Sequence, residues 1–330
     1  MSGVRCINDH KTKIYSIILI FTLAVGCLSG CAKSTIPLDY KTANDISASN
    51  LESRAEGFST NLAVTDRDVH AKDGFELEEN AAGGLFDVNK KEVLYAKQVH
   101  EQMNPASLTK VMTAICALKH GNPEDTIICS DNVLNLESGA TTCGLKPGDK
   151  LTLDQALHFL LLPSANDAAI AIAEHISGSV EEFSALMNSE AKLIGATNSN
   201  FVNPHGLTAD EHYTTVYDMY LITNEAIHFP SFMEIIQMKE YSTTITDKNG
   251  AEKSIEVKSS NKFHDGTFDA PENITVIGGK TGTTAAAGSC LTLVTIDRSN
   301  NPYIAVILHA SERSILYDEM ISLLTEINSR

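Results

Sequence analysis

Segments with strand character lie at both ends of the folded part of this chain, and the segments between them are helical. The stretch GGLFDVNKKEVLYAK (83–97) contains two strand-like runs that bracket a turn at NKK. Three apolar runs near the C-terminus, at 274–280, 289–297 and 302–309, predict further strands. Because strands from both ends must meet around a helical centre, this order predicts an α+β fold. We expect a mostly antiparallel sheet with packed helices and a helical lobe.

The central segments have apolar residues at helical spacing or nearly continuous apolar content. They are the stretches 107–120, 153–162, 166–177, 180–195 and 215–227. A second hairpin is predicted over 241–259, with its turn at Asn249-Gly250. The last helix should pack through one face, formed by Leu316, Met320, Leu324 and Ile327.

The N-terminus has the pattern of an export signal. Arg5, Lys11 and Lys13 precede the apolar run IYSIILIFTLAV, which is short for a membrane-spanning helix. The run is followed by LSGC, which resembles the lipobox of bacterial lipoproteins and would make Cys31 the lipidated first residue of the mature chain. An ordinary signal peptide cut nearby, or a single anchor helix, is the alternative, and all three readings place the protein outside the cytoplasm.

The chain therefore divides into a predicted lipoprotein signal peptide (1–30), a tether (31–80) and one folded domain (81–330). The tether is polar, rich in Ser, Asn, Asp and Glu, with scattered apolar residues. The formal net charge of −17 leaves no basic surplus to neutralise phosphates, so a nucleic-acid partner is not expected.

The cysteines of the folded domain do not predict a metal site. Cys116 and Cys290 lie in apolar helix and strand patterns and read as buried, inert thiols. Cys129 and Cys143 flank a polar segment and could pair in an oxidising compartment, although sequence does not fix the geometry. No Cys/His spacing resembles a zinc site and no H-E-x-x-H occurs, so no metal is predicted.

The stretch NPASLTKVMTAICAL carries the first chemical element. Pro105 precedes a helix that should begin near Ala106 or Ser107, which places Ser107 and Lys110 one turn apart on the same face. The surrounding helix is apolar, and desolvation lowers the pKa of a lysine towards values at which it accepts a proton. A neutral Lys110 can then deprotonate Ser107, whose place at the helix N-terminus favours an oxyanion nearby.

Spacing alone is weak evidence, because Ser-x-x-Lys recurs in this chain at Ser189/Lys192 and Ser259/Lys262. The stretch PSANDAA supplies a second element, Ser164 and Asn166, between two helical runs. Ser164 with Asp167 also fits a capping box for the next helix. Similar Ser and Asn pairs occur at 59/61, 130/132 and 259/261.

The stretch VIGGKTGTTAAAG (276–288) supplies the third element. Its strand should end near Gly278 and Gly279, where the absence of side chains lets another molecule approach the backbone. An edge with Lys280, Thr281 and threonines beside it suits a ligand that bears a carboxylate. A glycine-rich turn with a solvated lysine is the alternative interpretation.

Taken in order, NPASLTK, PSANDAA, NPHGL and GGKTGTT closely resemble the serine-type D-Ala-D-Ala carboxypeptidases, the low-molecular-mass penicillin-binding proteins. The resemblance covers residues 80–330 and implies a β-lactamase/transpeptidase-like fold for the 81–330 catalytic domain. It implies removal of the terminal D-alanine from peptidoglycan pentapeptide stems, through an acyl-enzyme that β-lactams also form. It implies no cofactor.

The resemblance also implies the catalytic roles. Ser107 would be the nucleophile and Lys110 its general base, while Ser164 with Lys280 would relay a proton to the departing D-alanine. The backbone N–H groups of Ser107 and Thr283 would form the oxyanion hole.

Substrate binding is implied at four further positions around these. Asn166 would hydrogen-bond the backbone of the substrate. Lys280, with the hydroxyls of Thr281 and Thr283, would receive the terminal carboxylate, and Gly282 would let the substrate lie along the strand.

Rival functions share these motifs. A class A β-lactamase uses a glutamate after the Ser-x-Asn element to activate water, and the segment GATNSNFVNPHGL offers none, the first acid beyond it being Asp210. His205 in this segment is expected to form part of a structural turn. An endopeptidase or transpeptidase on peptide crosslinks uses the same acyl-enzyme. A non-enzymatic wall-binding lipoprotein is the rival from another class.

Attachment to the membrane is expected through lipid. Many family members append a β-rich domain and an amphipathic anchoring helix, whereas this sequence stops after one helix. A diacylglyceryl group on Cys31 supplies the two acyl chains that stable anchoring needs. The expected location is the outer face of the bacterial cell membrane.

Overall fold

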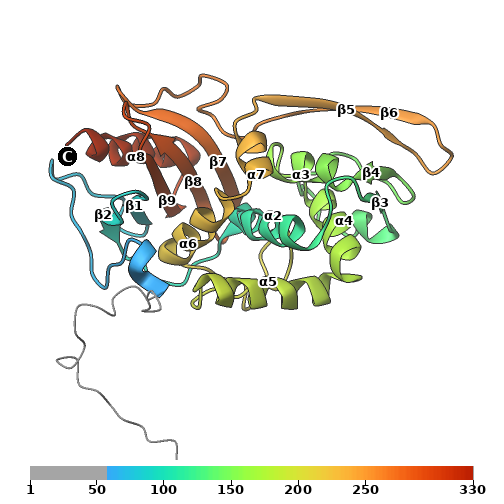
Figure 1. The fold of residues 1–330 in the computed structure, drawn as a ribbon, viewed down its shortest axis with the longest axis horizontal. Helices are drawn as coiled ribbons and strands as arrows, with labels where there is room; N and C mark the ends of the chain where they lie inside the picture. Colours follow the sequence, from blue (N-terminus) through green and yellow to red (C-terminus); the bar gives the residue numbers. More distant parts are fainter. Residues whose placement is uncertain (1–57, 330) are drawn as a thin grey trace, which may run out of the picture. The chain divides into compact units, whose positions relative to one another are not determined.

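The computed structural model describes residues 58–329 of the chain (Figure 1). The predicted signal peptide, the lipidation site Cys31 and the predicted tether as far as residue 57 lie outside the described residues.

The main sheet joins strands from the two ends of the described chain. Its strands are β1 (Ala82–Asp87), β2 (Glu92–Lys97), β7 (Thr275–Thr284), β8 (Gly288–Ile296) and β9 (Pro302–Ala310). They are ordered β2-β1-β9-β8-β7, and every pairing is antiparallel. The predicted α+β architecture is confirmed, and β7 lies at an edge of the sheet.

The two faces of this sheet serve two hydrophobic cores. Along β9, Ile304 and Val306 face the larger core, which includes the helical lobe, while Ala305 and Ile307 face a smaller core with α8 (Arg313–Thr325). This alternation follows from the two-residue period of a strand. The predicted face of the last helix is buried, as Leu316, Met320, Leu324 and Ile327.

The helical lobe lies on the other side of the sheet from α8 (Figure 1). Polar caps define where several helices begin. Thr152 and Gln155 form a capping box at the helix that starts at Leu153, and Ser179 and Thr215 cap the helices that start at Val180 and Val216. The lobe matches the predicted segments closely, as α2 (Thr109–His120), α3 (Leu153–Leu161), α4 (Asn166–Ser177), α5 (Val180–Ile194) and α6 (Val216–Ala226). A short helix that the sequence analysis missed, α7 (Pro230–Ile236), follows with proline in its first turn.

A second sheet contains the predicted hairpin, β5 (Glu240–Thr246) and β6 (Glu252–Lys258), with Gly250 at positive φ in its turn. The hairpin joins two strands that were not predicted, β3 (Thr126–Ile128) and β4 (Lys150–Thr152), in the order β3-β4-β5-β6. Strands of three residues are too short to show a period. Single 3₁₀ turns complete the fold, as η3 (Phe58–Asn61), η4 (Ala106–Leu108), η5 (Asp131–Leu134) and η6 (Glu326–Ser329).

The folded part begins earlier than predicted. Residues 62–80 were assigned to the tether, yet Ala63 and Leu77 are buried and Val69 pairs with Ala96 of β2. The Ala63 N–H also donates to the Tyr220 hydroxyl at 3.0 Å. The apolar residues of this segment are spaced without period, because it runs over the surface of the domain as an irregular layer.

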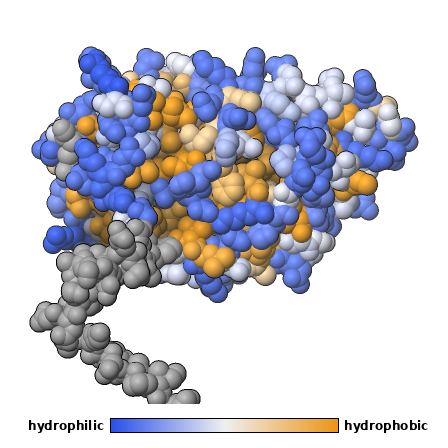
Figure 2. All heavy atoms as spheres, viewed as in Figure 1, coloured by the Kyte–Doolittle hydropathy of each residue, from blue (hydrophilic) through white to orange (hydrophobic). Residues whose placement is uncertain are grey.

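The surface is mainly hydrophilic, with hydrophobic side chains visible towards the middle of the view near α2 and α6 (Figure 2). Within residues 58–329, no helix is both long and apolar enough to cross a membrane. The same residues contain no group of three or more His, Cys, Asp or Glu side chains placed to hold a metal ion.

Candidate active site

Ser107 and Lys110 lie where the chain enters α2. The 3₁₀ turn η4 contains Ser107, and the α-helix itself begins at Thr109, slightly later than predicted. Lys110 is fully buried and its Nζ donates to Ser107 Oγ at 2.9 Å. The turn geometry thus places an amine directly beside a half-exposed hydroxyl.

Two further oxygen atoms hold the amine of Lys110. Its Nζ donates to Asn166 Oδ1 at 2.6 Å, at the start of α4, and to the His205 carbonyl at 2.7 Å. Burial lowers the pKa of Lys110 well below its ordinary value, and the nearby Lys280 charge lowers it further, while Asp167 opposes the shift. No carboxylate contacts this amine, so no negative charge there compensates for its burial. A neutral amine can donate to Asn166 Oδ1 and to the His205 carbonyl while its lone pair faces the Ser107 hydroxyl.

Lys280 approaches the same place from the edge strand β7. Its side chain is buried, its Nζ donates to the Thr281 carbonyl at 2.8 Å, and burial lowers the pKa of Lys280 to about 7. The strand does not end near Gly278 and Gly279 as predicted but continues to Thr284, paired with β8 throughout. Lys280 therefore lies within the strand, not in a solvated turn.

Strand β7 passes very close to the η4 turn, which contains Ser107. A Cβ atom on Gly282 would lie 2.8 Å from Ser107 N and 3.0 Å from Ala106 Cβ, so only glycine fits at this approach. Next along the strand, Thr283 is exposed. Thr281 Oγ1 lies 2.6 Å from Ser260 Oγ, a neighbour that the sequence gave no signal to find.

Ser164 lies in the turn before α4, two residues from Asn166. It adopts a left-handed backbone with φ of +70°, which is rare for a non-glycine residue. It does not form the capping box that was its alternative role, because the α4 N-cap is Ala165 and Asp167 instead accepts from Cys143 N and Leu145 N. No residue of the described chain hydrogen-bonds its hydroxyl.

The NPHGL turn supports this arrangement through its backbone. His205 is half-buried, and its Nδ1 accepts from Leu207 N at 3.2 Å. Burial, with the Lys110 charge, lowers the pKa of His205 to about 3, so its ring is neutral. A Cβ on Gly206 would lie 1.8 Å from the Ala106 carbonyl oxygen, so this turn packs directly against the η4 turn.

Two of the repeated spacings lie elsewhere in the fold, whereas those that begin at Ser259 lie next to Ser260 and its contact with Thr281. Ser189 and Lys192 lie on α5, and Ser130 caps η5. Cys129 and Cys143 are both free thiols, so the pairing considered from the sequence is not formed. Burial raises the pKa of Cys129 to about 12, and the thiol of Cys143 donates to Asp167 Oδ1 at 3.5 Å.

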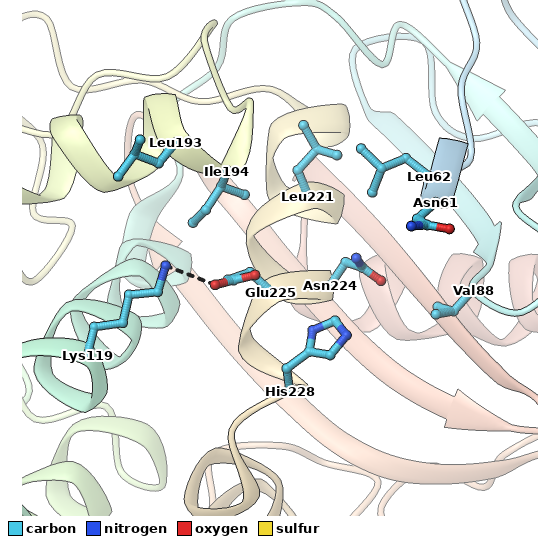
Figure 3. A pocket seen from close by; sticks show the side chains of 10 residues that line it. All are labelled: Asn61, Leu62, Val88, Lys119, Leu193, Ile194, Leu221, Asn224, Glu225 and His228. Carbon is cyan, nitrogen blue, oxygen red and sulfur yellow. Dashed lines mark ion pairs between the residues drawn. The ribbon is translucent and has the colours of Figure 1, made fainter. Parts of the chain in front are cut away.

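A separate cavity of about 330 Å³ lies at the far end of α2 (Figure 3). Leu193, Leu221 and the Lys119–Glu225 ion pair, with 2.9 Å between Nζ and Oε1, are part of its lining. It contains none of the predicted site residues.

Comparison with known proteins decides the family. The sequence profile of the Peptidase_S11 family, described as D-alanyl-D-alanine carboxypeptidase, matches residues 76–312. The chain belongs to this family. The matched range contains the turn with Ser107 and Lys110, the Ser164–Asn166 segment and the edge strand with Lys280.

Two curated relatives carry the same name. D-alanyl-D-alanine carboxypeptidase DacF of Bacillus subtilis is 34% identical over 236 residues, which cover 69% of this chain and 56% of that protein. D-alanyl-D-alanine carboxypeptidase DacC of Escherichia coli is 32% identical over 255 residues, which cover 73% and 59%. The chain thus spans less than two thirds of the length of these relatives.

Solved structures agree on the fold. The Streptomyces K15 DD-transpeptidase superposes with a TM-score of 0.70 at 23% identity, over 81% of this chain and all of that one. Penicillin binding protein 6B from Escherichia coli gives a TM-score of 0.64 at 25% identity, over 80% of this chain and 79% of that one. The fold is that of the DD-transpeptidases and penicillin-binding proteins.

Proposed function

We propose that this protein is a serine DD-carboxypeptidase that removes the terminal D-alanine from peptidoglycan pentapeptide stems. The observation that carries the proposal is the Lys110 amine, which is buried, has a lowered pKa and lies 2.9 Å from Ser107 Oγ. A neutral amine at this distance accepts the hydroxyl proton as Ser107 Oγ attacks the peptide carbonyl. The resulting tetrahedral oxyanion then collapses to an ester with Ser107.

The oxyanion is stabilised by the N–H groups of Ser107 and Thr283 in this proposal. Supporting it, the Ser107 nitrogen lies against β7 at Gly282, next to Thr283. Backbone donors that are fixed before the reaction stabilise the developing charge without reorganising, which makes them a large catalytic contribution. Asn166 holds the backbone of the substrate beside them.

The leaving D-alanine carries a carboxylate, which Lys280, Thr281 and Thr283 receive. A bound carboxylate favours the ammonium form of Lys280 and raises its pKa from about 7. Ser164 and Lys280 relay the proton that Lys110 took from Ser107 to the amide nitrogen as the C–N bond breaks, which leaves Lys110 neutral again. No residue of the described chain hydrogen-bonds the Ser164 hydroxyl, which is therefore available for this relay. Water then hydrolyses the ester, with Lys110 as base, and frees Ser107.

Mass spectrometry of a pentapeptide stem after incubation with the protein tests this proposal. The expected product has lost one terminal alanine, and Ser107→Ala abolishes the loss. Labelled penicillin should form a stable adduct on Ser107. Rapid turnover of penicillin would assign a β-lactamase instead, and cleavage only of crosslinked dimers would assign an endopeptidase.

We also propose that Cys31 carries a diacylglyceryl anchor after removal of residues 1–30, so that the domain acts on the cell wall from the outer face of the membrane. The support is the LSGC sequence after a basic and apolar leader. Labelling of cells with a radioactive fatty acid should mark the wild-type protein and not Cys31→Ser. Equal labelling of both would refute the anchor.

A further inference from the structure

A series of buried hydrogen bonds connects a loop distant in sequence to the η4 turn that contains Ser107. The Val202 N–H donates to His212 Nδ1 at 3.1 Å, and His212 Nε2 lies 2.8 Å from Thr109 Oγ1. Thr109 Oγ1 in turn donates to the Ala106 carbonyl at 2.8 Å. An amide N–H can only donate, so Nδ1 is the acceptor, Nε2 carries the proton, and the whole chain points towards Ala106.

The last acceptor in this series of hydrogen bonds is the carbonyl of a residue with a strained backbone. Ala106 has φ of +47°, in the left-handed region, where a side chain costs roughly 1–2 kcal/mol. Its carbonyl faces Thr109 and the Gly206 turn. In a trans peptide unit the carbonyl and the following N–H point to opposite sides. Anchoring the Ala106 carbonyl therefore directs the N–H of Ser107 away from Thr109, and the Ser107 nitrogen lies against β7.

We propose that His212 is a positioning residue, which acts through Thr109 and the Ala106 carbonyl to hold the Ser107 N–H in its oxyanion-binding orientation. The inference rests on the proposed function for its chemistry, although its geometry is independent of it. His212 touches no reacting atom. It fixes one peptide plane, and that plane carries one of the two proposed oxyanion donors.

The surroundings of His212 suit a fixed role. The ring is 3% exposed, and burial lowers its pKa to about 4. It therefore stays neutral, with one tautomer, at any pH where a cell-wall enzyme works. Thr109 is fully buried, so water cannot replace either of its partners.

Substitution of Thr109 gives a direct test with a matched control. Thr109→Val keeps the shape of the side chain but breaks the link, while Thr109→Ser restores the hydroxyl. The control is Thr223→Val, since Thr223 is equally buried and loses one hydroxyl contact, to Thr292 at 3.1 Å, in the core between α6 and β8. The measurement is the second-order rate of acylation of Ser107 by a fluorescent penicillin.

We expect Thr109→Val to acylate about tenfold to a hundredfold more slowly, somewhat less than the loss of an entire oxyanion donor. Thr109→Ser should recover most of the rate, and Thr223→Val should stay within about twofold of wild type although it loses comparable stability. His212→Leu should behave as Thr109→Val, and His212→Gln, which keeps a donor and an acceptor, should lie between it and wild type. A Thr109→Val rate equal to that of Thr223→Val overturns the proposal.

A second readout separates this inference from the proposed function. The amide of Ser107 is followed by NMR, in wild type and in Thr109→Val. A shifted signal with faster hydrogen exchange in the variant supports the positioning role, and an unchanged amide overturns it. Failure of penicillin to label wild type would refute the proposed function alone, and the amide measurement would still decide the role of His212.

Discussion

The two ends of helix α2 each hold a lysine, and their surroundings have opposite effects. Lys110, at the first turn, meets the Ser107 hydroxyl, the Asn166 amide oxygen and a backbone carbonyl, and its pKa is lowered. Lys119, in the last turn, lies between Glu190 at 3.1 Å and Glu225 at 2.9 Å, and hydrogen bonds to these carboxylates raise its pKa despite the opposing effect of burial.

Burial acts in the same direction on both lysines but is complete only at Lys110, so the extent of burial and the partners together decide the outcome. Neutral oxygens satisfy the hydrogen bonds of an amine without compensating its charge, whereas two carboxylates do both. The first end of α2 is therefore arranged for proton transfer and the second for stability. A buried lysine is a candidate base when no carboxylate contacts its amine.

The largest difference should appear in the rate of acylation by labelled penicillin. Lys110→Ala removes the proposed base and should slow acylation by roughly a thousandfold, within the range of general-base contributions. Lys119→Ala should acylate at the wild-type rate, because its ion pairs lie at the other end of the helix. Equal losses in the two variants would show that both act only through the stability of α2.

The pH dependence of kcat/KM should distinguish the roles of Lys110 and Lys280. On the acid side, kcat/KM should fall about tenfold per unit as Lys110 becomes protonated. On the alkaline side it should fall above pH 7, because Lys280, with a pKa of about 7 in the free protein, loses the charge that receives a carboxylate. A peptide that ends in D-alaninamide should lack the alkaline fall, and a fall that begins only near pH 10 would contradict the assignment.

Replacement of Lys280 and of Lys119 by methionine should change the free energy of unfolding in opposite directions. Between pH 7 and 10.5 the unfolded chain binds a proton that folded Lys280 does not, so wild-type stability rises with pH across this window. Lys280→Met should therefore stabilise the protein by about 1–3 kcal/mol at pH 7, and the gain should vanish towards pH 10.5.

Lys119→Met should instead destabilise the protein by about 1–2 kcal/mol at pH 7, because it leaves Glu190 half-compensated. The raised pKa of Lys119 means that the stabilisation it provides is present at neutral pH and is lost only as the pH rises through that value. Urea unfolding at pH 7 and 10 measures both effects. Destabilisation by both methionine variants at pH 7 would contradict the comparison.

Added salt should have the smallest effect on stability. The Lys119–Glu225 pair is partly exposed, so 1 M NaCl should weaken it by a few tenths of a kcal/mol. The Lys110 contacts to neutral oxygens should not respond. The loss of stability in salt should be smaller in Lys119→Met than in wild type, and identical losses would mean that the pair contributes nothing measurable.

Most of the fold could be predicted from the spacing of apolar residues along the sequence. The helices of the lobe and the strands at both ends were predicted because each has a long, regular apolar pattern, as in β9 and α8. The elements missed were those too short to show a period: β3, β4 and α7. The segment 62–80 was misassigned because it packs through isolated residues such as Ala63 and Leu77, and an irregular layer has no signature.

The site was predictable where chemistry is local. The proximity of Ser107 and Lys110 follows from helical spacing. The glycines of β7 indicated that another part of the backbone could lie close to the strand. The extent of β7 was misjudged, because glycine is a weak strand former and the pairing with β8 that continues the strand cannot be read from the local sequence. His212, Thr109 and Ser260 were missed, since their partners are more than 20 residues away or are backbone atoms that the sequence does not mark.

The glycines at 206 and 282 limit how this protein can change. A single added methyl at either position would collide with the backbone around Ala106 and Ser107, so neither site tolerates variation. Under the proposed function, substitution of these two glycines is therefore not an available route to resistance against β-lactams. A saturation library grown under selection should return glycine at both positions.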